Sequence, residues 1–439
     1  MDFLQNFKNS HNKHDLGGLF RVTVVDFEDS SGLNCGKKFA DLLQKNDIFE
    51  VLFLNEKFSK TFLNMQGRNF FDFIDKGNRI LEKCRSDIII WGYEEDGKIR
   101  LNFQTSSQYK IPNPDVFSLL NSLFIPLSYF GSQSEIPPSL QMLIKGCILS
   151  SITPITNSQK KHRNELLKEI VSFLAKDDSP KSLSKEFIPY IMNMLGKVYL
   201  SCVSEKITAD DIKIIHQLFN DALKNKQYMR LPIYYGCIYS NIGLLFEKAL
   251  GCDTANIESC LKIAIHNYNQ AQKLITKNYP YDYSLISYHL ALLYFEYWKH
   301  TSDLQALRDA TSQLREAEKI YSLAQFPQSW FHIEGLLGYY LTLLGTNISS
   351  NEIMLMAINA YKNQQKSFVL NKYPLEWAQI QEKIGEIFYV LGKKNNDETF
   401  MSEAKNYFSS AKNIYTELKN KNLQAKAQKM LDKIENYLE

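Results

Sequence analysis

One pattern recurs about every 47 residues through the second half of the chain, and it restricts the fold more than any other feature. Each copy has a small anchor residue that follows an aliphatic one, with an aromatic or aliphatic residue three positions later. Neighbouring anchors are 47 or 48 residues apart. The five anchors are Gly196, Gly243, Ala291, Gly338 and Gly385. A fixed period of this length is typical of proteins built from stacked helical repeats.

Each copy contains two predicted helices. Proline, which is favoured at the first position of a helix, lies eleven residues before the anchor in the four later copies. In the last copy Trp377, Ile384 and Phe388 then share one helical face. The second helix of that copy has a face made of Ala404, Phe408, Ala411 and Tyr415. One pair of helices cannot bury its apolar face alone, so we expect the copies to stack. The tryptophans, Trp330 and Trp377, should then be mostly buried between pairs, and the small anchors should allow close contact between helices.

The pattern resembles a known repeat. Aliphatic-Gly-x-x-aromatic, followed by Ala-x-x-x-aromatic-x-x-Ala, is similar to the tetratricopeptide repeat (TPR) over residues 183–418. The copies here are longer than the ~34 residues usual for that repeat. The tryptophan of the family pattern would fall at Gln381, whereas this chain has Trp377 one turn earlier. We therefore describe the copies as extended TPR-like units.

The resemblance implies a fold and a binding surface. The fold would be a helical solenoid of about five units over residues 183–420, followed by a capping helix over 421–439. In TPR proteins a concave groove is lined by first-helix residues that point away from the second helix, and it binds a peptide or protein. The corresponding residues here are Tyr288, Phe295, His332, Tyr339, Gln379, Glu382, Glu386 and Tyr389. An alternative is that the chain's own apolar segment, Leu140 to Ile155, partly fills the groove.

The repeat is absent from the N-terminal third, which alternates predicted strands and helices. Strands are predicted over residues 21–27, 48–54, 87–93 and 98–104, with helices over 35–44 and 69–84. This order indicates parallel pairing with right-handed crossovers, and the last two strands form a hairpin. We predict a small three-layer α/β domain over residues 15–112, with a mixed sheet of strand order 2-1-3-4. Residues 113–182 are predicted to form a helical linker, which makes the whole chain mostly α.

The stretches VTVVDFEDSSG (residues 22–32) and IIIWG (88–92) resemble the N-terminal domain of TolB-like proteins. The resemblance covers about 85 residues. It implies a role in assembly or binding and carries no catalytic motif.

Catalytic candidates are few. Asp26, Glu28 and Asp29 follow the first strand, at the end of the sheet where open α/β folds bind ligands. They could hold Mg²⁺ or accept a phosphoryl group, or they could be loop acids that cap the next helix. The stretch HNKH at residues 11–14 has metal-ligand spacing without a third ligand, and Cys35 begins a helix without an identifiable histidine partner. Phosphate-binding glycine motifs are absent, and we expect no cofactor.

Composition narrows the choice of partners. The net charge is only +3, from 51 basic and 48 acidic residues, so nucleic acid and membrane surfaces are not the expected partners. The seven cysteines include no C-x-x-C pair, which favours free thiols in a reducing compartment. The start of the sequence lacks the apolar core of a signal peptide, and we expect a cytoplasmic protein.

The sequence predicts a non-enzymatic scaffold that binds a protein or peptide. An alternative is a signalling protein whose N-terminal domain binds a nucleotide or is phosphorylated, with the repeats as a sensor. A third alternative is an adaptor for secretion or regulation that works as an oligomer.

Overall fold

The chain divides by its internal contacts into two compact units in the computed structural model. The division falls inside helix α10 (Pro280–Thr301): the first unit reaches Ile286, and the second continues from Ser287 to Glu439. The predicted domain limits at 112/113 and 182/183 do not coincide with this division. The described residues are 19–58, 68–105, 122–131, 135–152, 156–176, 185–203, 207–277, 279–324, 326–366 and 373–439.

The first unit contains a mixed sheet of five strands. These are β1 (Phe20–Asp26), β2 (Phe49–Lys57), β3 (Ile88–Glu95), β4 (Lys98–Thr105) and β5 (Leu123–Pro126). Their order is β2-β1-β3-β4-β5, with β1 parallel to β2 and β3, and β4 antiparallel to β3 and β5. The predicted order of the first four strands, 2-1-3-4, is confirmed.

Strand β5 corrects the prediction that residues 113–182 form a helical linker. All four residues of β5 pair with β4, and a short 3-10 helix, η4 (Leu127–Phe130), follows. A run of four apolar residues does not distinguish a strand from a buried helix by its periodicity. These residues form a strand because β4 has a free edge with which they can pair. Pro126 has no N–H to donate, and it lies at the last position of this edge strand.

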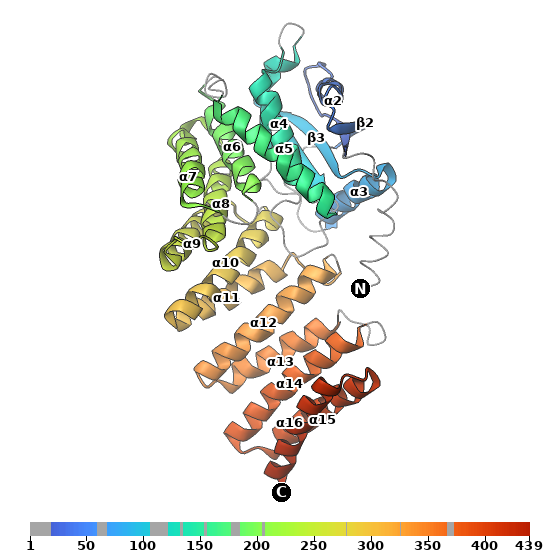
Figure 1. Ribbon diagram of the computed structural model, residues 1–439, viewed down its shortest axis with the longest axis vertical. Coiled ribbons are helices and arrows are strands. Elements are labelled where there is room, and N and C mark those ends of the chain that lie inside the picture. The colour runs from blue at the N-terminus through green and yellow to red at the C-terminus, as the bar shows by residue number, and fades with distance from the viewer. Residues whose placement is uncertain are drawn as a thin grey trace. The chain divides into compact units, whose positions relative to one another are not determined.

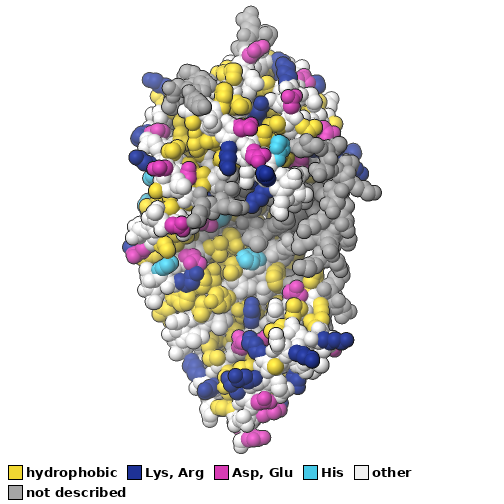
Figure 2. Space-filling model, in the orientation of Figure 1, with side chains coloured by type: hydrophobic (Ala, Val, Ile, Leu, Met, Phe, Trp, Pro, Cys, Tyr) yellow, Lys and Arg dark blue, Asp and Glu magenta, His cyan; other side chains and the backbone are white. Residues whose placement is uncertain are grey.

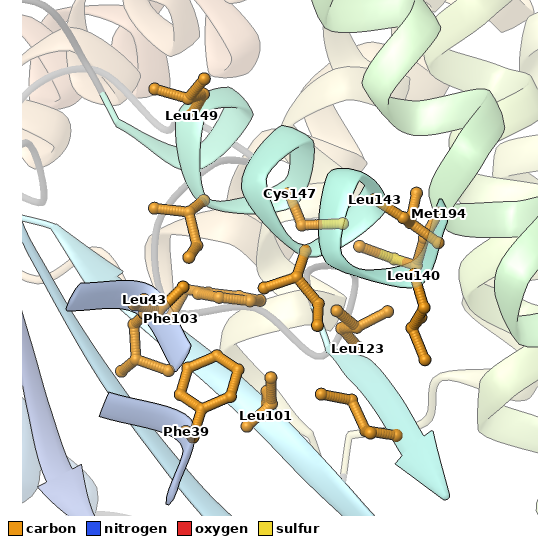
Figure 3. Close-up of a cluster of buried hydrophobic side chains, with 14 of the residues drawn as sticks. Phe39, Leu43, Leu101, Phe103, Leu123, Leu140, Leu143, Cys147, Leu149 and Met194 are labelled. Carbon is orange, nitrogen blue, oxygen red and sulfur yellow. The ribbon is translucent and has the colours of Figure 1, made fainter. Parts of the chain in front are cut away.

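Helices cover both faces of the sheet and produce the predicted three layers. On one face, α2 (Cys35–Gln44) and α4 (Pro138–Ser151) pack against the sheet, with α5 (Asn157–Lys176) contributing to the same core. Figure 3 shows side chains of α4 lying over Leu101, Phe103 and Leu123, with Phe39 and Leu43 of α2 beside them. On the opposite face, α3 (Arg68–Cys84) packs against Val25, Ile89 and Trp91. The described part of the segment that could have filled the groove, residues 140–152, therefore belongs to the hydrophobic core of the first unit.

Strand β4 buries its polar side chains as well as its apolar ones. Arg100 is 3% exposed and donates from Nε to Ser122 Oγ at 3.0 Å. Its Nη1 donates to Tyr234 Oη at 3.2 Å and lies 3.8 Å from a carboxylate oxygen of Glu95. Tyr234 belongs to helix α8 (Pro232–Ala249), so this cluster joins the sheet to the first repeats within one compact unit.

The repeats form pairs of helices. In the first unit the pairs are α6 (Ile188–Cys202) with α7 (Ala209–Lys224), and α8 with α9 (Ile257–Leu274). The second unit contains most of α10, then α11 (Leu304–Glu318), α12 (Pro327–Asn347), α13 (Asn351–Lys366), α14 (Pro374–Asn395), α15 (Glu398–Glu417) and α16 (Lys421–Leu438). Figure 1 shows α12 to α15 as successive helices stacked beside one another. The predicted helical array is confirmed, and α16 occupies the position predicted for a capping helix.

The anchor glycines lie against rings of the second helix in their own pair. A Cβ added to Gly243 would lie 2.7 Å from Tyr268 Cδ2, and one added to Gly338 would lie 2.9 Å from Tyr361 Cδ1. The same construction at Gly196 meets Phe219 at 2.6 Å, and at Gly385 it meets Phe408 at 3.1 Å. Distances below 3.0 Å are shorter than a side chain tolerates. Close approach of the two helices therefore explains why these positions are small.

The two repeat tryptophans differ in burial. Trp330 is 8% exposed, as predicted. Trp377 is only half-buried, and it packs at the edge of a cluster formed by α14, α15 and α16. The partial burial of Trp377 agrees with the prediction that both tryptophans are mostly buried, although Trp377 keeps a larger exposed fraction than Trp330.

Candidate functional site

Two of the eight residues predicted to line a groove are buried between helices. Tyr288 on α10 is 4% exposed, and its Oη lies 3.0 Å from Nε2 of His332 on α12. Glu382 on α14 is 5% exposed, accepts from Tyr415 Oη at 3.0 Å and lies 2.6 Å from Lys426 Nζ on α16. Both lie three residues before their anchors, where the side chain faces the following helices. A partner could not reach them without separating those helices.

The other six predicted residues remain at the surface. Tyr339 is 46% exposed, and Gln379 and Glu386 are also exposed. Phe295, His332 and Tyr389 are half-buried. The structure thus keeps most of the predicted set accessible on α10, α12 and α14.

Aromatic rings from α10 and α12 form one continuous cluster. Phe295 is its centre: its ring centroid lies 4.1 Å from that of Tyr340 in a stacked arrangement and 5.7 Å from that of Tyr339. Trp298 lies 5.5 Å from Phe295 on the same helix, and the ammonium of Lys299 lies 5.5 Å from the Phe295 ring. Tyr340 is 1% exposed. The exposed ring of Tyr339 is therefore supported from beneath by buried aromatic packing, which limits the entropy that it would lose on binding a partner.

An apolar stripe runs along the accessible side of α12. It consists of His332, Leu336, Tyr339 and Leu343, spaced by three or four residues, and we call it the α12 stripe. Each of these side chains is half-buried or exposed. Figure 2 shows hydrophobic side chains gathered over the region where Figure 1 draws α10 to α12. Leu336 and Leu343 were missed by the sequence analysis. Stepping along α12 from Tyr339 by helical periods, on the side away from the anchor, would have found them.

The equivalent side of α14 is mostly polar. Gln379, Lys383, Glu386 and Val390 replace the four residues of the α12 stripe at the same positions relative to the anchor. Partial burial raises the pKa of Glu386, an effect that the nearby Lys426 opposes. The Oε1 atom of Glu386 lies 3.8 Å from Lys426 Nζ. The apolar surface therefore gives way to a charged border at α14.

Burial lowers the pKa of His332, so its neutral form is favoured. Its hydrogen bond to Tyr288 joins α10 to α12 beside the stripe. The imidazole therefore contributes a polar, uncharged group to this surface at neutral pH.

The acidic loop after β1 supports the local fold. Asp29 accepts hydrogen bonds from the backbone N–H groups of Gly32 and Cys35, each at 3.1 Å. Asp26 accepts from the N–H of Phe27 at 2.9 Å. Burial, followed by the charge of Asp29, raises the pKa of Cys35 to about 12, which opposes a role as nucleophile. The interpretation that loop acids cap the next helix describes Asp29 well.

The described ranges contain no cluster of three or more His, Cys, Asp or Glu residues able to hold a metal ion. The HNKH stretch lies outside those ranges. All seven cysteines are free thiols. Within the described part of the chain, no helix is both long enough and apolar enough to cross a membrane.

Comparison with known proteins gives no match from which a function could be assigned. No model of a known protein family matches the chain, and no curated protein matches it.

Proposed function

We propose that this protein is a non-enzymatic interaction protein that binds a peptide or protein through the α12 stripe and the adjacent Phe295. The observation that carries the proposal is the 46% exposure of Tyr339 above the aromatic cluster of α10 and α12. Exposed apolar side chains that form a continuous patch are typical of interaction sites. The TPR-like pattern of the repeats supports the same conclusion, because TPR proteins bind partners through their first helices.

The chemistry of the surface favours a partner with apolar anchor side chains. Tyrosine is frequent among residues that dominate binding energy, and such residues each contribute ~2 kcal/mol or more. The half-exposed carboxylate of Glu386 at the α14 border favours a basic group beside those anchors. Lys426 already lies near this carboxylate, so the apolar contacts supply most of the expected affinity.

The test uses affinity capture with quantitative mass spectrometry on the full-length protein. The binding variant combines Tyr339→Ala with Leu336→Ala, which removes the centre of the α12 stripe while leaving the stacked Phe295 and Tyr340 in place. The matched control is Leu355→Ala, because Leu355 is a 40% exposed apolar residue on α13. Circular dichroism and thermal melting confirm that all three proteins are folded.

We expect a partner that wild type and Leu355→Ala retain and that the double variant loses by at least about tenfold, since 1.4 kcal/mol corresponds to that factor. If the folded double variant retains every partner at wild-type levels, the α12 stripe is not the binding surface.

A further inference from the structure

One edge of the sheet in the first unit is formed by a long strand. Strand β2 stands at the end of the five-strand order, and among the described residues it pairs only with β1. Its centre, from Val51 to Asn55, reads VLFLN and contains no charged residue and no proline. Natural proteins usually protect an edge strand with charges, prolines or a covering element, because its backbone groups can pair with another strand. The centre of β2 lacks the first two of these protections.

The backbone groups of β2 alternate between its two sides. The N–H of Phe20 in β1 donates to the carbonyl of Ile48 at 3.0 Å. Because alternate residues of a parallel strand bond to the same neighbour, Leu52 also directs its backbone groups towards β1. The N–H and C=O groups of Val51 and Phe53 therefore point away from the sheet, where they can bond to an added strand.

The side chains at this edge are apolar on both faces of the sheet. Leu52 is 44% exposed at the middle of the strand. On the opposite face, the side chains of Val51 and Phe53 are half-buried. A strand added beside β2 would remove apolar surface from water on both faces, in addition to satisfying the outward backbone groups.

We propose that β2 pairs with β2 of a second copy of this chain, antiparallel across a two-fold axis beside Leu52, so that the two sheets become one. A two-fold interface makes every contact twice, so the edge must be complementary to itself. In this register Leu52 lies opposite its own copy, and Val51 lies opposite Phe53 of the second copy. The outward backbone groups of Val51 and Phe53 then bond to each other. The two Leu52 side chains meet at a position without backbone hydrogen bonds, where the Cα atoms are ~4.5 Å apart.

The charges of the strand favour this register over its neighbours. A register with Phe53 opposite itself would place Glu50 opposite Glu56, and like charges directly opposite each other are destabilising. A shift in the other direction shortens the paired segment. In the proposed register Glu50 lies opposite Leu54, and its charge is balanced by Arg21, whose Nε donates to Glu50 Oε2 at 2.6 Å.

Helix α2 gives a second, independent indication of the same axis. The ammonium of Lys37 lies 5.5 Å from the ring centroid of Phe53 and 2.8 Å from Asp41, and both charged side chains are 56% exposed. Because α2 runs back between two parallel strands, Asp41 is displaced by about one turn, ~5.4 Å, towards Val51. The two-fold axis exchanges Phe53 for Val51, so it places Lys37 of each copy opposite Asp41 of the other.

A second copy therefore suits this edge in its backbone groups, its apolar side chains and its charges. Only one strand and one helix of each copy take part, so we expect a weak, concentration-dependent dimer. The pairing does not involve the α12 stripe, and it is independent of the proposed function.

Analytical ultracentrifugation of the full-length protein tests the dimer, at concentrations from about 1 µM to about 200 µM. The edge variant is Leu52→Lys, which would bring two ammonium groups together at the axis. The matched control is Leu355→Lys, because Leu355 on α13 is 40% exposed and the charge change is the same. We expect wild type and the control to dimerise, and the edge variant to have a dissociation constant at least about tenfold higher, equivalent to 1.4 kcal/mol. Circular dichroism confirms that all three are folded.

A wild type that remains monomeric over this range overturns the proposal and leaves the edge to a strand of another protein. A dimer that Leu52→Lys leaves unchanged, or that both lysine variants weaken equally, also overturns it.

Disulfide cross-linking tests the register. Leu52→Cys should form a bond across the axis under oxidation, because the expected Cα separation of ~4.5 Å lies within the range of disulfides. The control is Asn55→Cys, an exposed position in the same strand whose two copies would be ~20 Å apart. Wild type, which has seven cysteines, gives the background. We expect several-fold more cross-linked dimer from Leu52→Cys than from the other two proteins, and equal cross-linking of the two variants overturns the proposed pairing.

Discussion

At the scale of single residues, the size of each anchor varies with the residue at the matching position of the second helix. The four glycine anchors meet aromatic rings, as at Gly338 with Tyr361. The remaining anchor is Ala291, and the residue at the matching position of its second helix is Leu314, which has no ring. Both Ala291 and Leu314 are fully buried. The matching positions therefore hold glycine with an aromatic ring in four helical pairs and alanine with leucine in the fifth.

The matched pairs lead to a double-mutant prediction. Gly338→Ala should destabilise the protein by ~1–3 kcal/mol, because the new methyl group would overlap the Tyr361 ring. In a background that already carries Tyr361→Leu, the same change should be milder by ~1 kcal/mol, since the double variant has the residue types found at positions 291 and 314. Urea denaturation of the four proteins measures the coupling. Additive effects would show that the ring and the anchor do not restrict each other.

At the scale of helices and strands, the burial of β4 connects the sheet to the repeats. Arg100 is surrounded by the rings of Tyr93, Phe124 and Tyr234, each with its centroid between 5.4 and 5.7 Å from the guanidinium carbon. Phe124 in turn lies 4.5 Å from Tyr190 of α6, measured between ring centroids. The cation is therefore enclosed by groups from β3, β5 and α8, and its position depends on all of them.

Arg100→Met should lower the free energy of unfolding by roughly 3 kcal/mol, because it leaves Glu95 beside apolar rings without its cation. Adding Glu95→Gln should recover part of that loss. The control is Arg230→Met: Arg230 pairs with Asp96 at 2.8 Å, but their side chains are 72% and 39% exposed. Exposed pairs contribute ~0–1 kcal/mol. Chemical denaturation distinguishes the two arginines, and equal losses would argue against the buried cluster as a stabilising element.

At the scale of the whole molecule, the sheet shares its hydrophobic core with the repeats. Helix α6 contributes Ile191, Met194 and Val198 to the core that also holds the strands. The first compact unit accordingly extends to Ile286, well beyond the α/β segment. The sheet and the first repeats should therefore fold together.

A fragment that ends at Lys176 should fail to fold, because it lacks the α6 and α8 side chains that cover β4 and β5. A fragment that ends at Lys277 keeps α6 to α9 and should melt cooperatively. Circular dichroism and thermal melting of the two fragments test this prediction. A cooperative transition in the shorter fragment at the temperature of the longer one would contradict the shared core.

The sequence by itself determined the features that depend on local periodicity. The 47-residue spacing of the anchors predicted the helical pairs, and alternation of strands with helices predicted the order of β1 to β4. The repeat spacing and the alternation of strands with helices both depend on which side of each element is apolar. The close contacts at the anchor glycines were predictable for the same reason. A small residue that recurs on an apolar helix face indicates that another helix packs closely against that position.

Only the tertiary structure decided which partner each face meets. Strand β5 exists because β4 offers it an edge, and Arg100 is buried because three elements surround it. Tyr288 shares α10 with the half-buried Phe295, and Glu382 shares α14 with the exposed Glu386, yet Tyr288 and Glu382 face the next helices of the array. These contacts join residues that are distant in sequence or separated by a turn, and local periodicity contains no information about their geometry.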